Sequence, residues 1–263
     1  MRTATPSFVS VDKLGLKTSQ GTVFNDLSFS AEKGQLISIL GEPNSGKTAM
    51  LLCMCGRMKP TTGNCYIATY NVQKDFRHIR HMSQISLIPG LNDVQPFLKV
   101  KNITAAELSL DGKHGDRKHT DEYLKKWDFY DRINIRFDKL NVYDSCLFGI
   151  ILAMAGDPEL LIVDDIQTDL TQRESIKITK LLKKIATETG TTVLFACSEY
   201  RIAQYADAVV IVSQSKLEQR SLVLKNEPDA KTIPIVGYAN GVKNDKNTAK
   251  TKTNSNTLRK ERA

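Results

Sequence analysis

An eight-residue run, GEPNSGKT, places two glycines, a lysine and a threonine at the spacing G-x-x-x-x-G-K-[ST]. Glycines let the backbone approach a phosphate group closely, and the amides at the start of a following helix point toward it along the favourable end of the helix dipole. Lys47 would then reach the β and γ phosphates of a nucleotide, and the Thr48 hydroxyl would coordinate Mg²⁺. The residues expected to contact the nucleotide are Gly41, Glu42, Pro43, Asn44, Ser45, Gly46, Lys47, Thr48 and Ala49.

A second run, ELLIVDD at residues 159–165, is an apolar strand that ends in two carboxylates. Asp164 would hold Mg²⁺ through water, and Asp165 would polarise a water that attacks the γ-phosphate. Two aspartates that cap the following helix are the alternative interpretation, but the phosphate-binding loop earlier in the chain favours the nucleotide site. We therefore predict ATP and Mg²⁺ as cofactors, with Asp165 and Lys47 catalytic and Thr48 and Asp164 binding the metal.

The elements that position these residues alternate between strand and helix. Such alternation predicts an α/β fold with a largely parallel sheet flanked by helices. Strands are expected at 8–11, 23–29, 35–40, 64–70, 83–88, 160–163, 192–196 and 208–212, and helices at 49–58, 99–110, 119–128, 144–155 and 171–189.

Chain length and pattern limit the domain organisation. With 263 residues, of which 41% are hydrophobic, the chain can bury one substantial core. Helical patterns joined by a polar segment predict a helical subdomain inserted at about 91–145. We expect one nucleotide-binding domain over 1–214, followed by an extension at 215–263.

The charge and cysteine content restrict the environment of the chain. The net charge is +8, and residues 241–263 carry seven basic against two acidic residues, a composition that predicts disorder. This tail could contact anionic lipid, although a solubilising role explains it more simply; nucleic acid is not an expected partner. The five cysteines lack the spacing of a disulfide framework or a zinc site, and no apolar run is long enough to cross a bilayer.

Several blocks, in order, resemble the ATP-binding subunits of ATP-binding cassette (ABC) transporters over about residues 7–214. GTVFNDLSFSAEKGQLISILGEPNSGKT is similar to the family's opening strands and phosphate loop, GRMKPTTGNCYI to the next turn and strand, and AGDPELLIVDD to the second nucleotide motif. TTVLFACSEY and YADAVVIVSQSKL correspond to the last two core strands. The resemblance implies a P-loop NTPase-type sheet, largely parallel, with an antiparallel N-terminal β part and the inserted helical subdomain.

The chain departs from the family at most positions that sense or hydrolyse the nucleotide. The signature LSGGQ corresponds here to Leu140–Asp144, which contains no glycine. Its branched and aromatic side chains and the added Asp144 are expected to obstruct contact with the γ-phosphate of an opposite subunit. The other departures are Gly90 for a glutamine, Asp165 for the catalytic glutamate, Ser198 for a histidine, Thr171 for an aspartate, and the lack of an adenine-stacking aromatic near Lys17 and Thr18.

The resemblance therefore implies an ATP-binding subunit of a membrane transport complex, with slow or absent hydrolysis. It would lie in the cytoplasm, at the inner face of the membrane, and be held there by a transmembrane permease. A second copy, or a second ABC-type ATPase subunit, could complete its site. A non-transport module in which ATP is a regulatory or structural ligand is the alternative, and an active ATPase that energises export is a further one.

Overall fold

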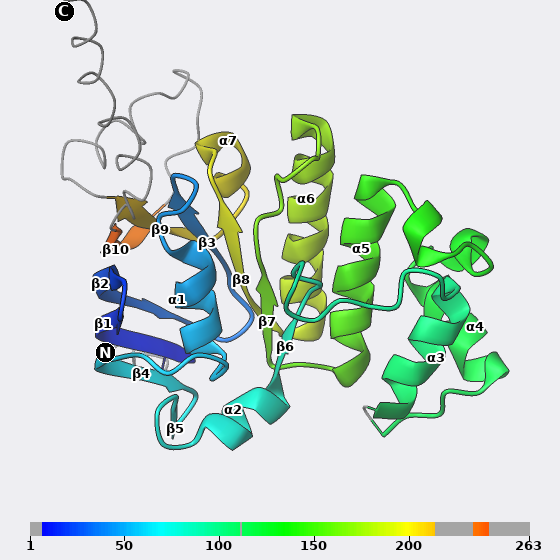
Figure 1. Cartoon of the computed structure of the whole chain (residues 1–263), viewed down its shortest axis with the longest axis horizontal. Helices are drawn as coiled ribbons and strands as arrows, with labels where there is room; N and C mark the ends of the chain where they lie inside the picture. The colour runs from blue at the N-terminus through cyan, green and yellow to red at the C-terminus, as the bar shows by residue number, and fades with distance from the viewer. Residues whose placement is uncertain (1–6, 111, 214–233, 242–263) are drawn as a thin grey trace, which may run out of the picture.

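One twisted sheet runs through the molecule. The computed structural model describes residues 7–110, 112–213 and 234–241. Within these ranges ten strands form a sheet in the order β5-β4-β1-β2-β10-β9-β3-β8-β7-β6 (Figure 1). The strands are β1 (Val9–Thr18), β2 (Gly21–Ala31), β3 (Leu36–Gly41), β4 (Thr62–Ile67), β5 (Tyr70–Asn71), β6 (Ser83–Ile85), β7 (Leu160–Val163), β8 (Thr192–Cys197), β9 (Ala208–Ser213) and β10 (Ile235–Gly241).

Helices cover this sheet and extend beyond it. The α-helices are α1 (Lys47–Met54), α2 (Phe76–Met82), α3 (Val100–Leu110), α4 (Arg117–Lys126), α5 (Val142–Ala153), α6 (Gln172–Thr189) and α7 (Tyr200–Ala203). The part of the chain that the structure describes also contains the 3₁₀ helices η1 (Tyr130–Arg132), η2 (Phe137–Lys139) and η3 (Met154–Gly156). The short helices α2 and α7 were not among the predicted elements, because each is too short to show a helical period.

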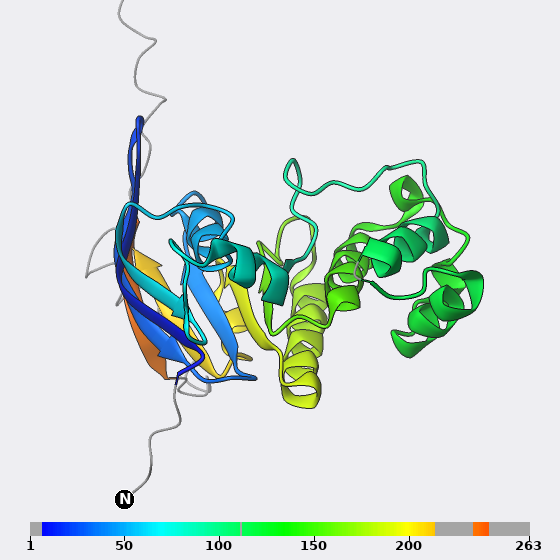
Figure 2. The same ribbon diagram turned by 90° about the horizontal axis from the view of Figure 1, so that it is seen from below.

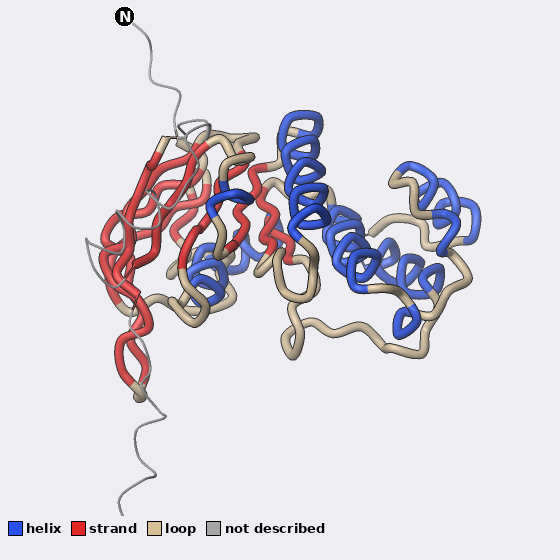
Figure 3. The backbone as a smooth tube through the Cα atoms, turned by 90° about the horizontal axis from the view of Figure 1, so that it is seen from above, coloured by secondary structure: helices blue, strands red, loops and turns tan. Residues whose placement is uncertain are grey.

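The predicted α/β fold is confirmed, including its two kinds of strand pairing. Strands β6, β7, β8, β3, β9 and β10 pair in parallel. Strands β1, β2, β4 and β5 pair antiparallel, and β2 also pairs antiparallel with β10. The β1–β2 hairpin projects beyond the neighbouring strands (Figure 2, Figure 3).

Strand β10 joins the parallel and antiparallel parts of the sheet. It lies in the segment that was expected to be an extension, so the sheet continues past the boundary expected at residue 214. The strand was missed because its run, IVGYANG, contains two glycines and follows a poorly patterned stretch. The basic tail at 242–263 lies outside the described residues.

The sheet is packed on both faces, and its central strands β3, β7, β8 and β9 are buried at every position. All four residues of β7 are buried, as expected of a parallel strand covered on both sides. Alternate side chains enter one core with α1 and the opposite core with α5 and α6. These two cores fix the carboxyl ends of β3 and β7, where the phosphate-binding loop and the aspartate pair begin.

A third core belongs to the inserted helices. Val100, Leu124, Phe129 and Phe148 pack together, and the rings of Phe129 and Phe148 stack with centroids 5.5 Å apart. Helix α5 contributes to this core and to the sheet core, so it joins the two parts, with α3 and α4 beyond it (Figure 1, Figure 2). Among the described helices, none combines the length and apolar character that a bilayer crossing requires.

Candidate nucleotide-binding site

The loop between β3 and α1 has the backbone shape of an anion cradle. Asn44 and Gly46 adopt left-handed conformations, with φ of 62° and 93°. Such residues within a tight turn direct successive backbone N–H groups toward one point, which suits a phosphate. Gly41 has no space for a side chain, because a Cβ there would lie 2.7 Å from the carbonyl oxygen of Val212 and 2.8 Å from Ser45 Oγ.

Lys47 lies folded back over this loop. Its Nζ donates hydrogen bonds to the carbonyl oxygens of Gly41 and Glu42, both at 2.8 Å. Burial lowers the pKa of Lys47, while the nearby carboxylates of Asp165 and Asp164 act in the opposite direction. A lysine held by neutral carbonyls can exchange them for phosphate oxygens, which bind an ammonium group more strongly.

Thr48 and Asp164 meet, as their predicted common role requires. The Thr48 hydroxyl donates to Asp164 Oδ2 at 2.6 Å, across the gap between α1 and the end of β7. The other oxygen, Oδ1, is buried with no hydrogen-bond partner among the described residues, and burial raises the pKa of this carboxyl group. A hydroxyl and a partnerless carboxylate oxygen are ligands that Mg²⁺ accepts, so these residues fit the predicted metal site.

Asp165 lies beside this pair but is turned outward. It is exposed, and its φ of 38° is in the left-handed region that favours glycine. Its Oδ2 accepts a hydrogen bond from the Thr168 hydroxyl at 2.6 Å. The carboxylate influences Lys47 through its charge, yet one of its oxygens is already engaged by the turn that follows β7.

Comparisons with known proteins show the family to which the chain belongs. The sequence profile of the ABC transporter family matches residues 24–168, which is more than half of the chain. This chain belongs to the ABC transporter family.

Individual relatives are distant but cover most of this chain. An uncharacterised ABC transporter ATP-binding protein of Mycobacterium tuberculosis is 27% identical over 201 residues, which are 74% of this chain and 81% of that protein. The lipoprotein-releasing system ATP-binding protein LolD of Blochmanniella floridana is 27% identical over 75% of this chain and 86% of its own. The methionine import ATP-binding protein MetN of Chlamydia abortus is 23% identical over 80% of this chain, which spans only 64% of that protein.

Solved structures share the fold. CbiO1 of Clostridium perfringens, part of the ABC transporter complex cbiONQ, superposes with a TM-score of 0.67 at 19% identity, covering 78% of this chain and 84% of that one. A dimeric bacterial ABC transporter cassette superposes with a TM-score of 0.66 at 20% identity, covering 77% and 93%.

The ABC signature position is occupied by the start of α5. The Asn141 side chain accepts from the Asp144 amide at 2.7 Å, so it is the N-cap of this helix. The expectation that the Asp144 carboxylate would face an opposing triphosphate is wrong. Asp144 is buried, and its Oδ2 accepts hydrogen bonds from Arg132 Nε at 3.3 Å and from Asn141 Nδ2 at 3.0 Å. The exposed residues of this segment are Asn141 and Val142, and Val142 is 49% exposed.

Ser198, which stands at the position of the ABC histidine, is contacted by Gln167, a residue that was not among the predicted site residues. Gln167 Oε1 accepts hydrogen bonds from the backbone amides of Ser198 and Glu199, the latter at 3.2 Å. This contact fixes the loop after β8 to the turn after β7, without placing an imidazole near the site. The sequence contained one weak signal for this contact. Gln167 is a polar amide residue only two positions after Asp165, separated from it by the apolar Ile166.

Two further departures have simple structural roles. Gly90 lies in an exposed turn with φ of 79°, where its amide donates to Asp93 Oδ2 at 2.9 Å, so no side chain reaches the site from this position. Thr171 is the N-cap of α6, in a reciprocal capping box with Glu174. The residue that replaces the family's aspartate therefore serves the helix.

Proposed function

We propose that this chain is the ATP-binding subunit of an ABC-type membrane transport complex, and that it binds ATP with Mg²⁺ and hydrolyses it slowly or not at all. The observation that carries the proposal is the joining of Thr48 and Asp164 beside an intact phosphate-binding loop. The loop would cradle the phosphates, Lys47 would stabilise their charge, and Thr48 and Asp164 would hold the metal.

Slow hydrolysis follows from the groups near the γ-phosphate position. Asp165 is one methylene shorter than glutamate, and its carboxylate accepts a hydrogen bond from the Thr168 hydroxyl. A displacement on the order of 1 Å can cost about a hundredfold in rate. Ser198 supplies no imidazole, and a missing transition-state donor is typically worth about 3 kcal/mol. Both differences act against the attack of water, even if their effects do not add.

The partners that we propose are a transmembrane permease and a second ATPase subunit. Leu91 and Phe97 follow Gly90 and are 50% and 60% exposed, an apolar surface that a coupling helix of a permease would cover. A second ATPase subunit with a complete signature would supply the contacts that Leu140–Asp144 lacks. Relatives named for methionine import and for lipoprotein release give no common direction, so we propose none.

Steady-state release of phosphate by the purified chain tests the proposal. We expect turnover well below about 1 per second, the lower end of the usual enzyme range. Asp165→Glu alone should recover little activity, because Ser198 still provides no stabilising group. Faster turnover by the wild-type chain, abolished by Lys47→Ala, would show an active ATPase and contradict the proposed slow hydrolysis.

A further inference from the structure

The last strand of the sheet determines where the basic tail (residues 242–263) begins. Gly241 is the last residue that the structure describes, and it ends β10, which lies between β2 and β9 (Figure 1). Gly241 pairs with Phe24 of β2, and Asn240 pairs with Ser213 at the end of β9. Because β10 is parallel to β9, and β9 to β3, the chain leaves the sheet at the edge where β3 ends.

Both strands that flank β10 contact the phosphate-binding loop. A Cβ at Gly46 would lie 3.0 Å from the carbonyl oxygen of Val23, in β2. A Cβ at Gly41 would lie 2.7 Å from the carbonyl oxygen of Val212, in β9. Neighbouring strands are about 4.8 Å apart, and β9 alone separates β10 from β3, so the ends of β10 and β3 lie about 10 Å apart. The basic tail therefore starts beside the loop.

The composition of the basic tail suits an anion. Its charged residues are Lys243, Lys246, Lys250, Lys252, Arg259, Lys260 and Arg262, against Asp245 and Glu261. The first two lysines, Lys243 and Lys246, follow Gly241 by two and five residues. An extended chain advances about 3.3–3.6 Å per residue, so the backbone and the long side chain together bring either lysine within reach of the phosphate-binding loop.

The nucleotide site carries more negative charge than its own lysine balances. Glu42, Asp164 and Asp165 all act through their charges on the ammonium group of Lys47. ATP would add more negative charge there than Mg²⁺ removes. A second copy of this chain would bring few donors to that charge, because its Leu140–Asp144 segment contains no glycine. Positive charge from within the same chain would therefore stabilise the bound nucleotide.

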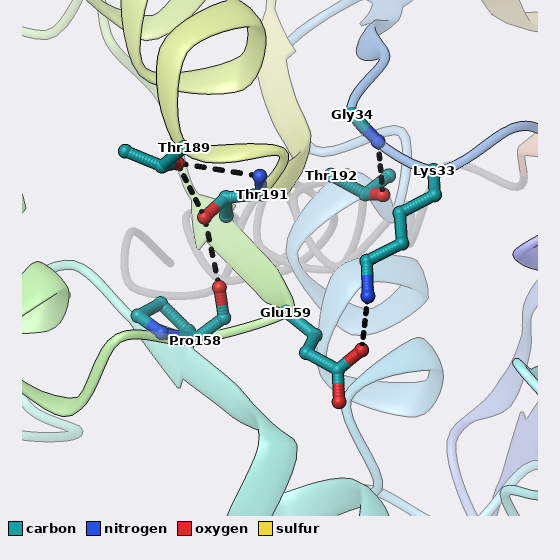
Figure 4. A network of polar contacts seen from close by, with 7 residues as sticks. All are labelled: Lys33, Gly34, Pro158, Glu159, Thr189, Thr191 and Thr192. Carbon is teal, nitrogen blue, oxygen red and sulfur yellow. Dashed lines mark hydrogen bonds and ion pairs between the residues drawn. The ribbon is translucent and has the colours of Figure 1, made fainter.

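The opposite edge of the sheet offers a basic segment much less. Figure 4 shows Lys33, before β3, paired at 2.6 Å with Glu159, before β7. Asp207, before β9, pairs with Lys183. The threonines of the network in Figure 4 bond to one another and to backbone groups. These carboxylates each have a lysine partner, whereas three carboxylates share Lys47 at the nucleotide site.

We propose that the basic tail folds back over the phosphate-binding loop, and that Lys243 and Lys246 bind the triphosphate of ATP in the same chain. This inference rests on the proposed function, because it takes ATP to be the ligand of the site. Ammonium groups bind phosphate oxygens through charge-assisted hydrogen bonds. AMP lacks the β and γ phosphates, so the tail contributes to the binding of ATP and not to that of AMP.

Calorimetric titration of the full chain with ATP compares two double variants that remove the same charge. Lys243→Gln with Lys246→Gln should weaken ATP binding about three- to tenfold, since exposed ion pairs are individually weak, and should leave AMP binding unchanged. Arg259→Gln with Lys260→Gln changes residues at least 18 positions beyond Gly241 and should bind ATP like the wild type. A longer connection lowers the effective concentration of a charge at the site.

An ATP analogue with an acyl group on its γ-phosphate tests the proposal without any substitution. A lysine amine beside the phosphate attacks the acyl carbon, forms an amide and releases ATP. Mass spectrometry of peptides from the labelled full chain should find the acyl group on Lys47 and on Lys243 or Lys246. It should not find the group on Lys260, and an excess of ATP should suppress the labelling.

Several results would overturn the proposal. Labelling of Lys47 without Lys243 or Lys246, or unchanged ATP affinity in their double variant, would leave the ATP site intact and remove the tail from it. Equal losses in both double variants would show a general effect of net charge. Binding to anionic lipid vesicles that depends on Lys243 and Lys246, with unchanged ATP affinity, would assign the tail to a lipid surface. A wild-type chain that neither binds ATP nor becomes labelled at Lys47 would overturn the proposed function itself, and this inference with it.

Discussion

Asp164 has two oxygens in different surroundings, and the difference makes it sensitive to protons. Oδ2 accepts from Thr48, while Oδ1 is buried without a partner among the described residues. In the absence of a cation, burial favours the neutral carboxyl group and raises its pKa. A proton and Mg²⁺ therefore compete for the same group.

Because of this competition, both the stability of the chain without a cation and the effect of Mg²⁺ on ATP affinity should depend on pH. The folded pKa of Asp164 lies above its unfolded value, so without a cation the ionised group costs stability, and that cost is relieved as the pH falls through the folded pKa. With Mg²⁺ the ionised form is required, so the gain in ATP affinity from Mg²⁺ should fade as the pH drops toward the raised pKa. Calorimetric titrations of the chain with ATP, with and without Mg²⁺ at several pH values, measure this gain in affinity. Asp164→Asn, which retains the titration of ATP itself, should lose the Mg²⁺-dependent gain at every pH; an unchanged gain would remove Asp164 from the metal site.

Lys47 permits a direct test of nucleotide binding. Lys47→Ala removes the ammonium group that is held 2.8 Å from two carbonyls of the phosphate-binding loop, and should weaken the binding of a labelled ATP analogue at least tenfold. Lys74→Ala, at an exposed lysine before α2, serves as the matched control and should bind like the wild type. Equal binding by wild type and Lys47→Ala would show that the nucleotide site is elsewhere.

At the scale of the element, the stability of α5 depends on its N-cap, Asn141, which stands within the segment that replaces the ABC signature. The Asn141 side chain accepts from the Asp144 amide and donates to its carboxylate. Asn141→Ala should lower the free energy of unfolding by about 1 kcal/mol, the usual cost of losing an N-cap. Chemical denaturation measures this, with Asn134→Ala at an exposed loop position as control. No difference between the two variants would mean that the cap does not stabilise the helix.

The elements that could be predicted are those with a local signal. The residues 160–163 are a continuous apolar run, and the structure has β7 at the same residues. The contact between Thr48 and Asp164 was also predictable, since both motifs follow strands of one parallel sheet. The pairing of Asp144 with Arg132 was not, because Arg132 lies in a 3₁₀ helix of the inserted subdomain and no spacing rule connects the two. Gln167 was missed for the same reason, since no spacing rule connects it with the backbone amides of Ser198 and Glu199.

At the scale of the whole molecule, self-association is the property that the altered signature should change. Val142 is exposed where the family presents glycine, and Leu140–Asp144 offers no glycine amides to an opposing phosphate. Two effects should oppose dimerisation, which are steric obstruction by these side chains and the loss of hydrogen bonds to the phosphate. Because Asp144 is paired with Arg132, we expect no additional charge repulsion from its carboxylate. The chain should dimerise only when a membrane partner holds two subunits at high effective concentration.

Light scattering coupled to size-exclusion chromatography tests this expectation. The variant is Asp165→Asn, which removes the proposed base so that bound ATP persists, and it should remain monomeric with and without ATP and Mg²⁺. The solved dimeric cassette shows that such domains can pair. An ATP-dependent shift to a dimer without any membrane protein would mean that Leu140–Asp144 is not the counterpart of the signature.

The place of β10 in the sheet also affects how the chain is made. β10 pairs with β2, an early strand, and with β9, and it begins about 20 residues after β9 ends. At roughly 5–20 residues per second, a ribosome needs on the order of seconds to deliver it after β9. During that time the nascent chain exposes two unpaired strand edges, which can pair with other chains. Newly made chains would therefore need protection, by chaperones or by low local concentration, until residue 241 has emerged.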